Sequence, residues 1–298
     1  MTDTAADLLS FPVVVTAFIA ALAVLWAVSY ALMRLTLDHA PRATAGIRKI
    51  GRRPRIADLW TRLRARFPRA TGFLGARVAT DRFTGLALTL LGVAGLYVVI
   101  VFAGLVEEVY ETEQIRAVDD AVFALVAPLR LPGLVGFFSS ITHAGDVENL
   151  AIVAAVATGF LWAHGPARYI PPLWIAIAGS QLTTWTGKFV IHRPRPDFVL
   201  DITAWSPSFP SGHATGAMAV YGLIAYVIAR DLPTVRQRFE VGFWTAILVA
   251  AVAFSRVFLN VHYPTDVAAG LLVGVFWIIV GITVAELRRH RTVGQPGR

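Results

Sequence analysis

The sequence contains no cysteine among its 298 residues. This absence excludes disulfide bonds, thiolate catalysis and metal sites built from cysteine. Charged residues are also scarce, at 15% of the chain, whereas hydrophobic residues make up 56%. A soluble domain of this length carries more charge than that. The two scarcities together favour a protein that is embedded in a membrane.

The N-terminal stretch MTDTAADLLSF lacks the basic residues that begin a cleaved signal peptide, so we expect the first apolar segment to be retained. Apolar residues gather in runs of about 20, the length that crosses about 30 Å of hydrocarbon. The mean hydropathy of the chain is +0.62. We predict an all-α, polytopic membrane protein with seven spans, of which the third is short and contains Asn149. The predicted spans are 11–33, 83–105, 147–162, 170–191, 213–229, 241–259 and 265–286.

The net charge of +8 is compatible with nucleic-acid binding, but the basic residues concentrate beside the predicted spans. We therefore expect a membrane partner and no nucleic acid. Apolar residues recur at helical spacing between Ile56 and Phe67, inside an arginine-rich segment. This pattern predicts an amphipathic helix that lies on anionic lipid. The alternative is a solvated linker whose arginines only set the topology.

The arginine bias also predicts the orientation of the chain. The basic segment 34–82 and the tail 288–298 are expected inside, and the acidic connection 106–146 outside. Residues 121–141 of that connection are predicted to form one or two short interfacial helices. With an outside N-terminus, the end of the fourth span, the start of the fifth, the end of the sixth and the start of the seventh share the outer face.

Three patches of ionisable residues lie at those four helix ends. They read KFVIHRPRP from Lys188, PSGH from Pro210 and SRVFLNVHYPTD from Ser255. Ionisable side chains at the edge of a bilayer are costly, so they usually have a functional task. The topology therefore predicts one polar site that is assembled from three distant parts of the chain.

The residue types in these patches suit a phosphoryl group. Ser211 is placed to cap one helix and Pro264 to start another, and free N–H groups at helix starts bind anions. Lys188, Arg195 and Arg256 add full positive charges. Phosphoryl transfer depends mainly on positioning and charge stabilisation, so these groups meet its needs without a metal.

Two histidines supply the remaining chemistry. Asp266 follows His262 by four residues, so it can hold one tautomer and leave the other ring nitrogen free to attack. His213 is placed to protonate a leaving oxygen. Each residue alone also has a structural explanation, such as a first-turn acid, a snorkelling cation or a helix cap. A serine triad of Ser211, His262 and Asp266 would leave the three cations unexplained.

Other ionisable residues of the region have less specific roles. Arg193 is a weaker candidate for assisting Arg195, and His143 and His192 are expected to be interfacial.

The three motifs resemble the signature of the type 2 phosphatidic acid phosphatase (PAP2) superfamily, K-x6-R-P, P-S-G-H and S-R-x5-H-x3-D, in order and spacing. The resemblance covers 83–287 and implies a six-helix core. It implies that His262 is a nucleophile that forms a phosphohistidine and that Asp266 supports this nucleophile. It also implies that His213 is the general acid. It implies no metal and no cofactor. The residues expected to bind phosphate are Lys188, Arg195, Ser211, Gly212 and Arg256. Asn260 replaces a glycine that is frequent in the family, and we expect no consequence.

This resemblance divides the chain into an extra transmembrane helix (1–35), a basic cytoplasmic segment (36–82), the phosphatase core (83–287) and a basic tail (288–298). It implies a metal-independent lipid phosphatase of a bacterial inner membrane, with its site facing the periplasm. Undecaprenyl diphosphate is favoured as substrate over phosphatidylglycerophosphate and phosphatidic acid. The alternatives are a lipid phosphotransferase, a vanadate-dependent haloperoxidase and a non-catalytic lipid carrier. The sequence does not define the oligomeric state.

Overall fold

A computed structural model describes residues 16, 20–39, 54–79, 83–111, 113–165, 167–196 and 206–293, and every regular element among them is a helix. The all-α prediction is therefore confirmed. The chain divides into two compact units, Met1–Gly75 and Ala76–Arg298, which we describe separately. Parts of the predicted basic segment (40–53 and 80–82) and of the tail (294–298) lie outside the described residues.

The first unit contains a helix, Ala20–His39, that is long and apolar enough to cross a membrane. The predicted first span 11–33 thus ends too early, and most of its first nine residues lie outside the described part. Helix α2 (Pro54–Arg66) begins at proline, a residue suited to the first turn, and is followed by α3 (Pro68–Val78). Leu59 and Trp60 of α2 are exposed. The predicted amphipathic helix is present, and its lipid partner stays a prediction.

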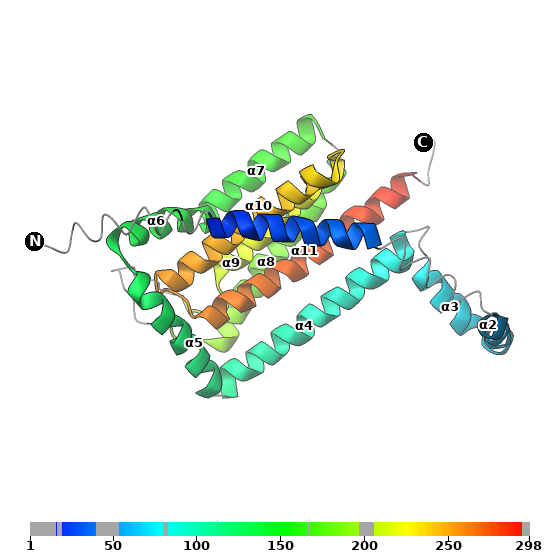
Figure 1. Cartoon of the computed structure of the whole chain (residues 1–298), viewed down its shortest axis with the longest axis horizontal. Helices are drawn as coiled ribbons and strands as arrows, with labels where there is room; N and C mark the ends of the chain where they lie inside the picture. Colours follow the sequence, from blue (N-terminus) through cyan, green and yellow to red (C-terminus); the bar gives the residue numbers. More distant parts are fainter. Residues whose placement is uncertain are drawn as a thin grey trace, which may run out of the picture. The chain divides into compact units, whose positions relative to one another are not determined.

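The second unit is a bundle of helices, and three of its connections contain a short 3-10 turn (Figure 1). A short π-helix, Phe83–Ala87, precedes the first of them. The helices are α4 (Leu88–Glu111), α5 (Glu113–Val126), α6 (Pro132–Thr142), α7 (Val147–Ala163), α8 (Ile170–Ile191), α9 (Gly212–Asp231), α10 (Val235–Phe258) and α11 (Pro264–Val293). The 3-10 turns are Ala127–Leu129, His143–Gly145 and Ala167–Tyr169.

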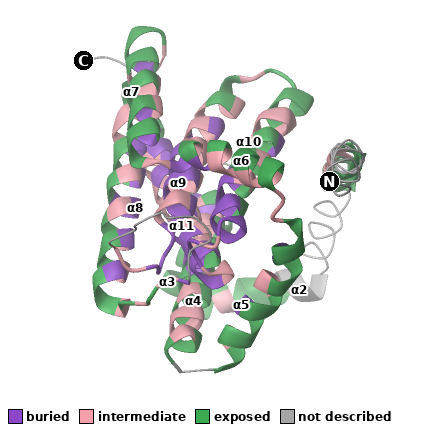
Figure 2. Ribbon diagram, turned by 90° about the vertical axis from the view of Figure 1, so that its left-hand side faces the viewer, coloured by how far each residue is buried: buried purple, intermediate pink, exposed green. Residues whose placement is uncertain are grey.

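Helix α9 occupies the centre of this unit and contacts α7, α8, α10 and α11 (Figure 2). Small residues on its buried faces, such as Ala214 and Ala217, let the neighbouring backbones approach closely. On α11, a Cβ at Gly270 would stand 2.6 Å from the Ser211 carbonyl oxygen, and one at Gly274 would stand 2.5 Å from Met218 Cβ. The contact between α9 and α11 therefore requires glycine at both positions.

The outer helices carry large apolar side chains on their exposed faces, for example Leu96 and Ile100 of α4 and Val156 and Phe160 of α7. Such a surface is suited to lipid, which offers no polar partners. Five helices of the described chain are long and apolar enough to span a membrane. The chain is therefore a multi-pass membrane protein.

The seven predicted spans need one correction. The predicted third and fourth spans are present as α7 and α8, but they are not among the five. Helix α7 has only 17 residues, and the 22-residue α8 contains polar residues such as Gln181 and Thr184. Helices α5 and α6 are two short helices bent by 119° at a break, as the sequence predicts for 121–141, and they can count as one broken span.

Candidate active site

The three ionisable patches meet at one end of the second unit, as the topology predicts. The backbone N–H of Ser211 donates to the carbonyl oxygen of Asp266 at 3.0 Å, so the start of α9 is bonded to the first turn of α11. Arg195, in the segment after α8, donates from Nη1 to the Val261 carbonyl oxygen at 2.9 Å. Three distant parts of the chain thus form one site, and the side of the membrane on which it lies stays a prediction.

The start of α9 has the polar groups of an anion cradle. Ser211 has the N-cap position, as predicted, but its hydroxyl makes no capping bond. The Ser211 Oγ and the Arg256 Nε are both buried without a hydrogen-bond partner. Buried polar atoms nearly always have partners, so both atoms are candidates for contact with a ligand. Next to the free N–H groups of a helix start, they suit an oxyanion.

The predicted cations surround this cradle, and the protein holds them through neutral oxygens. Lys188 donates to the Pro207 carbonyl oxygen. Arg195 donates from Nε to the Ser206 carbonyl oxygen at 2.8 Å, and Arg256 donates from Nη1 to Thr142 Oγ1 at 2.6 Å.

Within the described part of the chain, no carboxylate forms an ion pair with any of the three cations. Lys188 and Arg256 are buried and Arg195 is partly buried. Buried charges without a counterion are costly, and an anion bound here would supply the missing charge.

His262 lies among these cations with one ring nitrogen toward each side of the site. Its Nδ1 is 3.5 Å from Asp266 Oδ2, too long for a good hydrogen bond, and its Nε2 is 3.2 Å from Arg195 Nη1. Burial lowers the pKa of His262 well below its ordinary value, and the charges of Arg256 and Arg195 lower it further. The imidazole is therefore neutral near pH 7. A proton on Nδ1, toward the carboxylate, leaves the Nε2 lone pair facing the cations.

Arg193 has a different place from the one that the sequence suggests. Instead of joining Arg195 at the cradle, it donates from Nη1 to Asp266 Oδ1 at 2.7 Å and from Nη2 to Asp119 Oδ2 at 2.8 Å. Its guanidinium carbon lies 4.0 Å from the centre of the Tyr263 ring. Arg193 therefore fixes the carboxylate behind His262.

Asp119 is a residue that the sequence analysis missed. It is fully buried in α5 and accepts from the backbone N–H of Thr265 at 3.0 Å and from its hydroxyl at 2.8 Å. Val122 and Val126, three and seven positions later, pack into the core. Helical spacing alone places Asp119 on that same buried face, and an acid on such a face is the signal that was available.

A second missed carboxylate contacts His213. The Nε2 of His213 lies 2.8 Å from Asp146 Oδ1, and the other oxygen of Asp146 lies 2.7 Å from His143 Nδ1. The hydrogen bond with His213 lowers the pKa of Asp146 to about 2, and the bond with His143 contributes in the same direction. His143 is exposed, as an interfacial residue would be, but it also belongs to this chain of contacts.

The replacement of glycine by Asn260 is accommodated by the backbone. Asn260 has a φ of 57°, in the left-handed region. Asparagine tolerates this conformation better than most residues other than glycine. The turn before His262 therefore accepts asparagine at this position, and the absence of a functional consequence stays a prediction.

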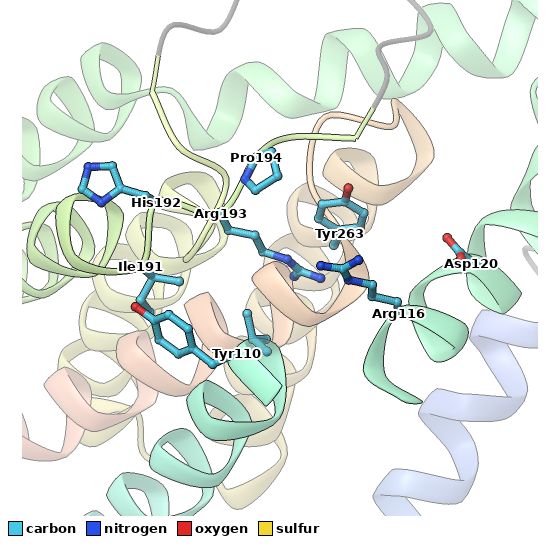
Figure 3. Close-up of a pocket in the computed structure, with 9 residues that line it drawn as sticks. Tyr110, Arg116, Asp120, Ile191, His192, Arg193, Pro194 and Tyr263 are labelled. Carbon is cyan, nitrogen blue, oxygen red and sulfur yellow. The ribbon is translucent and has the colours of Figure 1, made fainter. Parts of the chain in front are cut away.

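A pocket of about 390 Å³ adjoins the site on the side of Arg193 and Tyr263. The ends of α4 and α8 and part of α5 form its remaining walls (Figure 3). Tyr110, Ile191 and Pro194 give it apolar surface, and Arg116 gives it a second guanidinium. Among the described residues, no group of three or more histidine, aspartate and glutamate side chains could hold a metal ion.

Buried polar atoms at a helix start, three cations without an ion pair in the described part of the chain, and a neutral imidazole within a helical membrane bundle indicate a phosphoryl-transfer enzyme of the membrane. Comparison with known families agrees: the profile of the PAP2 superfamily matches residues 169–289. Phosphatidylglycerophosphatase B of Bacillus subtilis is 30% identical over 60% of this chain and 90% of its own length. Decaprenylphosphoryl-5-phosphoribose phosphatase of Mycolicibacterium smegmatis is 30% identical over 52% of this chain and 82% of its own length.

The fold also matches a solved member of the same superfamily. The crystal structure of a transmembrane PAP2-type phosphatidylglycerolphosphate phosphatase from Bacillus subtilis superimposes with a TM-score of 0.59. It is 25% identical in sequence and covers 68% of this chain and 98% of its own. The chain belongs to the PAP2 superfamily and is a membrane phosphatase.

Proposed function

We propose that this protein is a metal-independent lipid phosphatase that removes a terminal phosphate through a phosphohistidine at His262. The observation that carries this proposal is the set of three cations around a neutral imidazole, none of which has a carboxylate partner among the residues that the structure describes. Such a site is complementary to a phosphate dianion, and it supplies the charge stabilisation on which phosphoryl transfer depends.

The proposed reaction has two steps. The phosphate enters the cradle, Lys188, Arg195 and Arg256 bind its oxygens, and the Nε2 of His262 attacks phosphorus. The bond from phosphorus to the leaving oxygen breaks, and His213 gives that oxygen a proton. Water then attacks the phosphohistidine as His213 takes a proton back, the P–N bond breaks, and inorganic phosphate is released.

The substrate is proposed to be a phosphate monoester or diphosphate on a lipid headgroup. The names of both relatives refer to lipid-linked phosphates, and the relative with the larger coverage is a phosphatidylglycerophosphatase. We therefore place phosphatidylglycerophosphate beside undecaprenyl diphosphate, with phosphatidic acid as the third candidate. The pocket beside Arg193 has a volume suited to a polar headgroup, about 390 Å³. By the arginine bias, the site faces the periplasm of a bacterial inner membrane.

The test is phosphate release from these three lipids by purified protein in detergent with EDTA. The wild type is expected to release phosphate from at least one of them, and His262→Ala is expected to release none. His164→Ala is a matched control, because His164 is an exposed histidine at the end of α7. An acid-labile phosphoprotein should be trapped from the wild type only.

Two results would contradict the proposal: robust turnover by His262→Ala, or complete loss of wild-type activity in EDTA. If the phosphate appears on an added lipid or sugar alcohol instead of in solution, the enzyme is a phosphotransferase.

A further inference from the structure

Two residues outside the three motifs, His143 and Asp146, form a chain of contacts that ends at His213, the proposed general acid. His213 contacts one carboxylate oxygen of Asp146 at 2.8 Å, and His143 contacts the other at 2.7 Å. Asp146 has the N-cap position of α7, but its side chain makes no capping bond. Both of its oxygens are therefore directed at histidines, and helix capping does not explain this residue.

The segment that carries Asp146 is held firmly against α9 and α10. The Tyr221 hydroxyl donates to the Ala144 carbonyl oxygen at 2.7 Å, and the Asn149 amide donates to the His143 carbonyl oxygen at 2.7 Å. A Cβ at Gly145 would stand 2.6 Å from Val252 Cγ1, so the backbone touches α10 directly. A carboxylate on such a support has a fixed position relative to His213.

We propose that Asp146 is a positioning residue for His213, as Asp266 is for His262. This inference rests on the proposed function, because His213 acts as an acid only in that reaction. Asp146 holds the Nε2–H of His213, fixes the ring, and leaves Nδ1 as the nitrogen that protonates the leaving oxygen. The site then contains two histidine–aspartate pairs, one for attack on phosphorus and one for the leaving group.

The charges around His213 explain why it needs such a partner. Burial of the ring opposes a positive charge on it most strongly, and Arg256 from α10 and Arg195 from the segment after α8 oppose it further. His262, in the turn before α11, is so close that a positive charge on one of the two rings disfavours a positive charge on the other. Asp146 opposes these influences from the start of α7, and His143 shares its carboxylate. The protonated form of His213, which is the acid, is thus stabilised by Asp146.

Protons balance over the two steps. In the first step the proton on Nδ1 of His213 moves to the leaving oxygen as the P–O bond breaks. In the second step Nδ1 takes a proton from the attacking water as the P–N bond breaks. Asp146 keeps its charge throughout and gains or loses no proton.

The test compares two substrates on Asp146→Asn. Dioctanoyl phosphatidate has an alkoxide leaving group that needs a proton, whereas p-nitrophenyl phosphate has a phenolate that does not. We expect kcat/KM on the phosphatidate, which reports only the steps up to formation of the phosphohistidine, to fall by about 10- to 100-fold, part of the value of a general acid. On the aryl phosphate kcat/KM should stay within about threefold of the wild type, since no acid is required in that step.

Glu148→Gln is the matched control, because it removes an exposed carboxylate two positions away in the first turn of α7. It should leave both rates unchanged. The ratio of the two rates on one preparation does not depend on the folded fraction, so partial misfolding of Asp146→Asn cannot imitate the effect. His143→Gln, which leaves the contact between Asp146 and His213 in place, should change the ratio less than Asp146→Asn does.

Equal losses of kcat/KM on both substrates would show a structural role for Asp146 and overturn the inference, as would an unchanged kcat/KM on the phosphatidate. Wild-type protein that hydrolyses neither substrate would instead refute the proposed function, and the inference with it. The two failures are therefore distinguishable.

Discussion

Replacing Asp119 by asparagine tests the support behind the proposed nucleophile. Asp119 accepts three hydrogen bonds, from Arg193 Nη2 and from the backbone N–H and hydroxyl of Thr265. Asparagine has the same shape but only one acceptor oxygen. If that oxygen faces Arg193, the amide nitrogen faces the Thr265 N–H, and two donors oppose each other inside the protein.

The cost follows from those bonds. An unsatisfied buried N–H costs about 1–3 kcal/mol, and a charge-assisted bond that becomes neutral loses about 1 kcal/mol. We expect a loss of about 3 kcal/mol in the free energy of unfolding. At about 2–4 °C per kcal/mol, the midpoint of thermal unfolding in detergent should fall by about 6–12 °C. Phosphate release should fall too. Arg193 is held by Asp119 and in turn holds Asp266, the carboxylate behind His262.

The measurement is thermal unfolding followed by tryptophan fluorescence, with phosphate release assayed on the same samples. Asp120→Asn is the matched control, since Asp120 is the next residue of α5 and is exposed. Its effect should stay within about 0.5 kcal/mol, the usual range for surface positions. If Asp119→Asn unfolds with the wild-type midpoint, the hydrogen bonds seen here do not carry the energy assigned to them.

Two further outcomes follow from the charges at the site. Arg256→Met should lower kcat/KM by about 10²–10³, since one charge-stabilising donor is lost. The same change should leave thermal stability equal or higher, because it removes a buried charge that lies near like charges; a large drop in the unfolding midpoint would contradict this. Because the pKa of His262 is held well below its ordinary value, its neutral form persists as the pH falls. The acid limb of kcat/KM for the aryl phosphate should therefore lie below the ordinary histidine pKa, and a limb at or above that value would refute the assignment.

The sequence was sufficient to predict that the three patches come together. Each patch sits at the end of a long apolar run, and successive spans of a membrane bundle alternate in direction. Residues as distant as Arg195 and His262 are therefore placed on the same face by topology alone. The contacts within one patch, such as His262 with Asp266, follow from spacing along a single turn.

The residues that the sequence did not indicate come from 113–146, where local patterns are short and mixed. Asp119 and Asp146 obtain their partners only when α5, α6 and the turn after α6 fold back over the helix ends. Their hydrogen bonds join positions 74 and 67 residues apart, in the pairs Arg193–Asp119 and His213–Asp146. No local pattern encodes such pairs. The polar residues of α8 were likewise visible, but the length of the run outweighed them in the prediction of spans.

The backbone bond between Ser211 and Asp266 has a consequence for the evolution and engineering of this enzyme. Peptide groups are present whatever the side chains are, so the bond ties the helix that carries His213 to the helix next to His262 through atoms that mutation rarely removes. Substitutions at other positions should therefore change the distance between the two imidazoles little. Headgroup preference can be redesigned at pocket positions such as Tyr110 and Arg116. Asp119 of α5 and Thr142 of α6 must stay, because they hold Arg193 and Arg256, and position 270 must stay glycine.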